Sequence, residues 1–189
     1  MAPRPLPSLT RDQIVAQAFI LLEEEGLESL SMRRLAGKLN VQAPALYWHV
    51  TDKAELLGMM ARDIYAAAYA GTDAAQDWRD WLMQFGRALH ASLASHRDGA
   101  RLCAMARPPS PLDAQIQASR IAAPLSALGL EEDQALAHQA AVIAFTLGWS
   151  TYEANGPMRD FLRQIMDFDA TFTIGLEALV SGLDLRRPG

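Results

Sequence analysis

The sequence contains a single cysteine, Cys103, among its 189 residues. A lone cysteine excludes an internal disulfide and a cysteine-rich zinc site, and it fits a reducing compartment. Long apolar runs are also absent, since the longest, Ala140 to Trp149, is too short to span a bilayer. The proline-rich start, MAPRPLPSLT, lacks the apolar segment of a signal peptide. We therefore expect a cytoplasmic protein with neither export nor membrane insertion.

Positive charge is scarce, because 17 Lys and Arg stand against 22 Asp and Glu, for a formal net charge of −5. This balance argues against a uniformly basic nucleic-acid binder. Residues 1–53 carry six basic and six acidic side chains, which leaves 11 basic and 16 acidic ones in the rest of the chain. The acidic excess therefore lies wholly in the C-terminal part.

Period-two alternation of apolar and polar residues, which indicates strands, is missing, whereas helical periodicity is frequent. Capping patterns at Thr10, Ser31 and Asp52 predict three helix starts, and Gly26 predicts the end of the first helix. Further helices are expected near 77–96, 100–105, 112–128, 132–153 and 158–182. The expected fold is all-α, with three short helices before a larger bundle.

Residues 31–50 predict a helix, a tight turn and a short second helix, APALYWHV (43–50). With the capped helix before them, they form a helix-turn-helix arrangement, whose second helix lies in the major groove of DNA. Leu46 and Val50, one turn apart, are expected to pack inward. The opposite side of the short helix would then present six residues outward: Gln42, Ala43, Ala45, Tyr47, Trp48 and His49.

The outward groups have a chemistry that suits DNA, since aromatic and imidazole side chains contact phosphates, sugars and thymine methyls. Arg33 can reach a guanine edge with two parallel hydrogen bonds, worth about 1–3 kcal/mol of discrimination. Lys53 opens the next helix, where its ammonium and nearby backbone amides can hold a phosphate. The alternative is that Tyr47, Trp48 and His49 merely pack against the bundle, as aromatic residues at helical spacing often do.

The span from Leu9 to about Met60, above all LSMRRLAGKLNVQAPALYWHVTDKAELL (30–57), resembles the TetR family of bacterial one-component repressors. The segments SHRDGARLCAMARP (95–108), AFTLGW (144–149) and GLEALVSG (175–182) resemble the larger domain of the branch around the tetracycline repressor. The resemblance implies a DNA-binding domain over 1–52, with a Pro-rich N-terminal arm, and a ligand-binding and dimerisation domain over 53–189. It also implies a homodimer that binds a palindromic double-stranded DNA operator and releases it when a small-molecule effector binds.

Carried over residue by residue, the resemblance assigns DNA contacts to Arg33, Pro44, Tyr47, Trp48, His49 and Lys53. Their outward position adds Gln42, Ala43 and Ala45 to the expected DNA-binding residues. Arg33 would read a base, Pro44 would touch thymine methyls and Lys53 would hold phosphate. Ala43 and Ala45 stand where the tetracycline repressor has a base-reading glutamine and a threonine. The operator sequence therefore does not carry over.

Small residues recur at three- and four-residue steps on the last two predicted helices. They are Ala137, Ala141, Ala144 and Gly148 on helix 132–153, and Gly175 and Gly182, with Phe172 and Leu179, on helix 158–182. Small residues permit close helix approach, so these helices from two subunits are expected to form a four-helix dimer interface. The alternative is that both faces belong to the intramolecular core.

The ligand-binding candidates are Phe85, Leu89, Cys103, Met105, Arg107, Phe145, Trp149 and Tyr152. Phe85, Leu89 and Cys103 stand where the tetracycline repressor has an asparagine, a phenylalanine and a metal-binding histidine. The second metal-binding histidine is missing near Ala66 to Ala68, so we expect no metal and no magnesium–tetracycline effector. An apolar or aromatic effector is favoured, with Arg107 available for an anionic group. The alternative is that these side chains only fill the core.

Two other classes of function compete with regulation. An enzyme would need a catalytic or cofactor motif, yet the sequence contains no Glu-x-x-His pair, HExxH, GxSxG or phosphate-binding glycine loop. His90, His96 and His138 are isolated, and Cys103 is more typical of an inert buried thiol than of a redox sensor. We therefore expect no catalytic residue and no cofactor. A helical interaction module without DNA binding is the third possibility.

Overall fold

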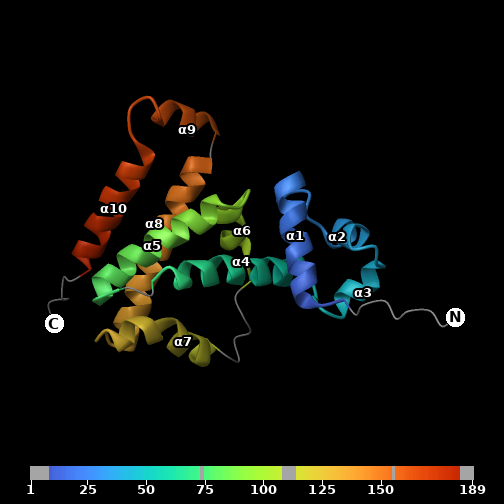
Figure 1. The fold of residues 1–189 in the computed structure, drawn as a ribbon, viewed down its shortest axis with the longest axis horizontal. Helices are drawn as coiled ribbons and strands as arrows, with labels where there is room; N and C mark the ends of the chain where they lie inside the picture. The colour runs from blue at the N-terminus through green and yellow to red at the C-terminus, as the bar shows by residue number, and fades with distance from the viewer. Residues whose placement is uncertain (1–8, 73–74, 108–113, 155, 184–189) are drawn as a thin grey trace.

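The computed structural model describes residues 9–72, 75–107, 114–154 and 156–183, which form ten helices and no strand (Figure 1). The helices are α1 (Arg11–Glu25), α2 (Met32–Lys38), α3 (Ala43–Tyr47), α4 (Lys53–Ala70), α5 (Trp78–Ala94), α6 (Gly99–Met105), α7 (Ala114–Ala127), α8 (Glu132–Ala154), α9 (Gly156–Leu162) and α10 (Phe168–Gly182). The all-α prediction is confirmed. The Pro-rich arm, and the start of the helix expected at 112–128, lie outside the described residues.

Side-chain caps determine where the N-terminal helices begin. The Thr10 hydroxyl accepts from the Gln13 amide at 3.2 Å, and Gln13 Oε1 accepts from the Thr10 amide at 3.0 Å, which completes the predicted capping box. At α4, the Asp52 carboxylate accepts from the Glu55 amide at 2.8 Å. The Glu55 carboxylate does not return that bond, because it accepts from the amide and hydroxyl of Thr51. The capping box expected from Asp52 and Glu55 is therefore only half formed.

The turn between α2 and α3 depends on Asn40, which adopts a left-handed conformation with φ of 55°. Beyond it, the Val41 amide donates to the Ala36 carbonyl at 3.0 Å and so closes the end of α2. Leu46 and Val50 are fully buried in the core shared with α1 and α2. This inward packing was predicted, and it fixes which side of α3 faces solvent.

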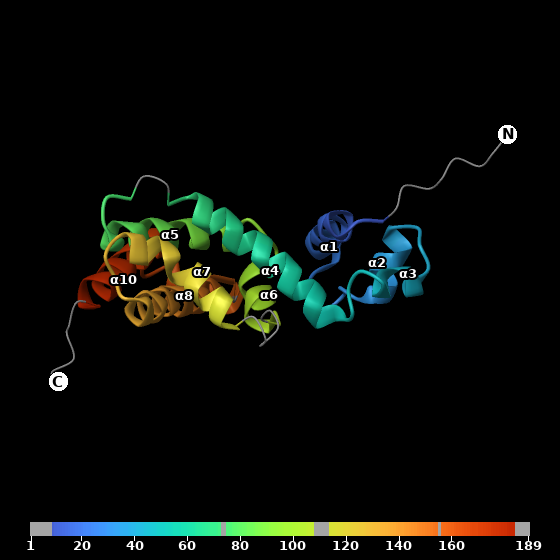
Figure 2. The same cartoon turned by 90° about the horizontal axis from the view of Figure 1, so that it is seen from below.

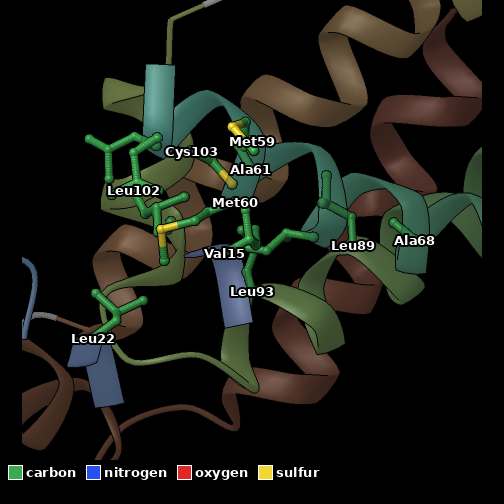
Figure 3. Close-up of a cluster of buried hydrophobic side chains, with 14 of the residues drawn as sticks. Val15, Leu22, Met59, Met60, Ala61, Ala68, Leu89, Leu93, Leu102 and Cys103 are labelled. Carbon is green, nitrogen blue, oxygen red and sulfur yellow. The ribbon is translucent and has the colours of Figure 1, made fainter. Parts of the chain in front are cut away.

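Helix α4 joins the α1–α3 unit to the bundle of α5–α10, and the two parts lie at opposite ends of the molecule (Figure 2). One continuous apolar core crosses the junction. In Figure 3, Val15 and Leu22 of α1 belong to the same cluster as Met60 of α4, Leu93 of α5 and Leu102 of α6. Helix α1 is therefore packed directly on the larger part of the chain.

The prediction of one helix over 158–182 is wrong. Helix α9 ends at Leu162, and α10 begins afresh at Phe168, with the Asp167 carboxylate accepting from the Ala170 amide at 2.9 Å. The break reorients the chain so that Phe168 packs edge-on against Trp149 at a ring distance of 5.9 Å. An aromatic core contact and a local cap thus override the continuous helical periodicity.

The predicted small-residue faces divide between the core and the surface. Phe172 is buried against Phe145, and a Cβ added to Gly175 would lie 2.8 Å from that same ring, so both residues belong to the intramolecular core. Ala144 and Gly148 of α8, in contrast, are exposed together with Ala137. Within the described residues, none of the helices is long and apolar enough to cross a membrane.

Candidate nucleic-acid interface and effector region

Helix α3 is shorter than the predicted APALYWHV helix. It ends at Tyr47, and the amides of His49 and Val50 both donate to the Leu46 carbonyl at 2.9 Å. A helix of five residues has no stability of its own and needs its neighbours. The buried Leu46 and Val50 provide that support, so the outer surface of α3 is presented on a fixed frame.

The outer surface of α3 and the turn after it is apolar, aromatic and open to solvent. The Trp48 side chain is 88% exposed and that of Tyr47 is 52% exposed, and together with Pro44 they line an apolar hollow. Gln42 is also exposed, whereas Ala43, Ala45 and His49 are half-buried. The alternative in which Tyr47 and Trp48 pack against the bundle is therefore wrong. Exposed large apolar groups clustered in this way mark an interaction surface.

Basic side chains near this surface differ in how far they are neutralised. Arg34 and Lys38 of α2 pair with Glu25 and Glu24 of α1. Arg33 is exposed and makes no side-chain hydrogen bond or ion pair within the part of the chain that the structure describes. Its guanidinium is therefore available to a ligand beside α3.

Lys53 is half-buried at the start of α4. Its Nζ donates to the Leu27 carbonyl at 3.1 Å and so ties α4 to the turn after α1. An ammonium group has three N–H donors, so two are left for an anion. Lys53 therefore has a structural contact in addition to its predicted phosphate contact.

The eight ligand-binding candidates fall into separate groups. Phe85 and Leu89 of α5 are fully buried, and Phe85 lies against Tyr69 and Trp81, with ring centroids 5.1 and 5.0 Å away. A second aromatic group on α8 contains Phe145 and Trp149, both packed on α10. Met105 and Tyr152 are instead exposed, at 56% and 41%. The structure therefore does not bring all eight residues around one centre.

Cys103 lies in the apolar junction between α4 and α6, near Met59 and Met60 (Figure 3). Burial raises the pKa of its thiol to about 12. A thiol that stays protonated is a poor nucleophile and a poor redox sensor. Cys103 is therefore best understood as an apolar wall residue.

Arg107 lies away from both aromatic groups. Its guanidinium donates to the Asp52 carboxylate at 2.8 Å, and its amide donates to the Ala54 carbonyl at 3.4 Å. Gly58 allows this approach, because a Cβ there would lie 2.7 Å from the Arg107 carbonyl oxygen. The segment after α6 is thus attached to the first turns of α4 and does not offer its cation to the buried aromatic residues.

The Asp52 carboxyl provides a test of this attachment. Its pKa lies below the ordinary value because the Glu55 amide donates to the carboxylate and because Arg107 pairs with it. We expect Arg107→Gln to raise the pKa of Asp52 while leaving it below normal, since the amide bond remains. NMR titration of the carboxyl carbon measures the pKa in both proteins, and Arg87→Gln, which removes an exposed ion pair with Glu177, is the matched control. An unchanged Asp52 pKa would contradict the attachment.

Three contacts were not foreseen from the sequence. The Tyr69 hydroxyl donates to Gln139 Oε1 at 3.2 Å, between α4 and α8. His90 pairs with Glu153 at 2.6 Å, so this histidine has a partner rather than being isolated. Asp98 contacts the turn after α1. Gln139 alone left a signal, as a long polar side chain between Ala135 and Val142 on the buried face of its helix.

Comparisons with known proteins agree with this geometry. Residues 14–60 match the family model described as bacterial regulatory proteins, tetR family, and residues 70–164 match the tetracyclin repressor-like C-terminal domain. The chain is 31% identical to the tetracycline repressor protein class A from transposon 1721 of Escherichia coli, over 96% of this chain and 94% of that protein.

Two solved structures are similar over nearly the whole chain. A TetR variant from Acinetobacter baumannii AYE in complex with minocycline has a TM-score of 0.76 and 31% identity, over 93% of this chain and 97% of that one. BioQ with its natural double-stranded DNA operator has a TM-score of 0.68 and 34% identity, over 94% and 99%.

The helix-turn-helix unit, its solvent-facing aromatic surface and the helical bundle define a DNA-binding transcriptional regulator rather than an enzyme. The chain belongs to the TetR family, as the sequence resemblance implied.

Proposed function

We propose that this regulator is a homodimeric repressor that binds a palindromic operator and releases it when a small apolar or aromatic effector binds. The observation that carries the proposal is the exposed surface of Pro44, Tyr47 and Trp48 on a helix that its neighbours hold rigidly. A rigid, solvent-facing recognition helix is what major-groove binding requires. The similar structure that holds a DNA operator supports the operator-binding part of the proposal, and the one that holds minocycline supports the effector-binding part.

The proposed division of the chain puts DNA binding in 1–52, and ligand binding and dimerisation in 53–189. The exposed small residues Ala137, Ala144 and Gly148 of α8 are the proposed centre of the dimer contact. Dimerisation matters because one half-site contact set binds weakly, whereas two sets about 34–36 Å apart bind with avidity. Such a dimer would act on DNA in the bacterial cytoplasm.

Selection of bound sequences from a random DNA pool, followed by footprinting, tests DNA recognition. We expect a palindromic site, a steep loss of affinity with rising salt and a large ratio of specific to random binding. Light scattering on the eluted complex should show two chains per site. Equal affinity for random DNA, or a monomer on every site, would contradict the proposal.

Arg33 is the proposed base-reading residue, because its guanidinium has no partner in the described part of the chain. We expect Arg33→Ala to relax selection at one base pair of each half-site and to lower affinity for the selected operator by about 5- to 150-fold per contact. Arg34→Ala is the matched control, since Arg34 is already paired with Glu25. Repeating the DNA selection with both variants measures the change in base preference, and titration of the selected operator measures the change in affinity. Identical losses for Arg33 and Arg34 would remove the base-reading role.

A further inference from the structure

Gln139 is a fully buried amide in the centre of the bundle, with an exposed fraction of 0%. Its Oε1 accepts from the Tyr69 hydroxyl of α4 at 3.2 Å, whereas its Nε2 has no hydrogen-bond partner. On the same buried face of α8, Ala135 and Val142 are apolar, and the Thr146 hydroxyl donates to the Val142 carbonyl at 2.8 Å. Gln139 therefore presents an unused N–H donor in the buried interior.

An unused buried donor destabilises a fold, so such groups in native proteins need a physical explanation. The Tyr69 hydroxyl fixes the orientation of the amide, because it occupies the carbonyl end and leaves the NH₂ end for another group. The natural complement of an N–H donor is an acceptor oxygen, such as a ketone carbonyl. A bound molecule with such an oxygen would satisfy Gln139.

Aromatic rings pack on the Tyr69 side of this contact. The Tyr69 ring lies 5.1 Å from that of Phe85 and 5.9 Å from that of Trp81, and Trp81 and Phe85 stack at 5.0 Å. Offset stacking on such rings favours flat, ring-containing molecules. Phe85, one of the predicted ligand contacts, therefore packs on the same tyrosine that bonds Gln139.

The tyrosine that bonds Gln139 and the nearby Tyr65 are uncharged. Burial raises the pKa of both Tyr65 and Tyr69, so their hydroxyls stay protonated. Arg107, the cation predicted for an anionic effector, is paired with Asp52 instead. An ion placed beside Gln139 would lose its hydration without gaining a counter-charge. A charged effector is therefore disfavoured here.

We propose that Gln139 is the hydrogen-bond donor of the effector site and that the effector is an uncharged, ring-containing molecule with a carbonyl or similar acceptor oxygen. This inference rests on the proposed function, because it specifies the chemistry of the effector. It replaces the anionic effector group that Arg107 was expected to bind with an uncharged one. It also gives the effector a route to the DNA-binding part, since Gln139 contacts α4 through Tyr69.

Three flat tricyclic probes of nearly equal size test the chemistry: fluorenone carries an acceptor oxygen, carbazole carries an N–H donor, and fluorene carries no hydrogen-bonding group. A fourth probe, fluorene-9-carboxylate, adds an anionic group that projects from the ring plane. Calorimetry on the whole protein without DNA should show fluorenone binding about 3- to 10-fold more tightly than fluorene, as expected for one neutral hydrogen bond. Carbazole and the carboxylate should bind no better than fluorene.

Gln139→Met should bring the ratio of fluorenone to fluorene affinity to about one, while Gln134→Met, on the exposed side of the same helix, should leave it unchanged. If Gln139→Met fails to fold, the wild-type protein still decides, since one Gln139 side-chain N–H proton should move further downfield with fluorenone than with fluorene, as a new hydrogen bond requires. Failure of fluorenone to bind, equal binding of fluorenone and fluorene, tighter binding of carbazole or of the carboxylate, or equal N–H shifts with fluorenone and fluorene would each overturn the proposal. Operator binding is measured separately on the same samples, so a failure of DNA recognition is distinguishable from a failure of the ligand assignment.

Discussion

We expect Trp48→Ala to weaken operator binding by about 10³-fold while leaving the fold intact. Centrally placed aromatic residues of an interface are each worth about 2 kcal/mol or more. A dimer carries two copies, so the combined loss of about 4 kcal/mol corresponds to that factor. Because the Trp48 side chain is 88% exposed, its removal leaves no cavity in the core. The free energy of unfolding should change by less than about 0.5 kcal/mol.

Fluorescence anisotropy with the selected operator measures the affinity, and urea denaturation measures the stability of the same sample. Ile116→Ala is the matched control, since Ile116 is 61% exposed on α7, away from α3. Equal operator affinity for wild type and Trp48→Ala would mean that the aromatic surface has some other partner. A loss of stability together with affinity would mean that Trp48 supports α3 from inside.

The parts of the fold that were predictable from the sequence depend on local signals. The capping box at Thr10 and the short-range turn at Asn40 involve residues within a few positions of each other, so their side chains determine the backbone directly. The inward packing of Leu46 and Val50 follows from their one-turn spacing. For the same reason, the outward direction of Tyr47 and Trp48 was predictable.

The unpredicted features depend on partners far away in the chain. Arg107 pairs with Asp52, 55 residues earlier, and Gln139 meets Tyr69, 70 residues earlier. Neither partner is visible in a spacing pattern. The break before Phe168 also depends on a distant partner. The helical periodicity of the sequence continues through the break, and the contact that accompanies it is the packing of Phe168 on Trp149. The surroundings of the candidate effector residues were therefore less predictable than the exposed surface of α3.

Asp98 joins the α5–α6 corner to the turn after α1. It adopts a left-handed conformation, with φ of 57°, and its Oδ2 accepts from the Leu27 amide at 3.0 Å. Beside it, Arg97 Nη1 donates to the Glu23 and Glu24 carbonyls, each at 3.2 Å, at the end of α1. Together with Arg107, these contacts attach α6 and its flanking segments to the DNA-binding part. We therefore expect a movement of α6 to affect α1 as well as α4.

Asp98→Ala is expected to lower the free energy of unfolding by about 2–5 kcal/mol. The Leu27 amide would lose its acceptor, which costs about 1–3 kcal/mol, and alanine in a left-handed conformation adds about 1–2 kcal/mol. Asp98→Gly removes the acceptor without the strain, and Asp98→Asn retains both an acceptor oxygen and tolerance of this conformation. The loss in free energy of unfolding, measured by urea denaturation, should therefore be smallest for Asp98→Asn, larger for Asp98→Gly and largest for Asp98→Ala.

Because the junction lies between the proposed effector and operator sites, Asp98→Ala should also weaken operator release by an effector, whereas Asp98→Asn should preserve it. Equal losses for all three variants would show that neither the Leu27 bond nor the backbone conformation holds the junction together.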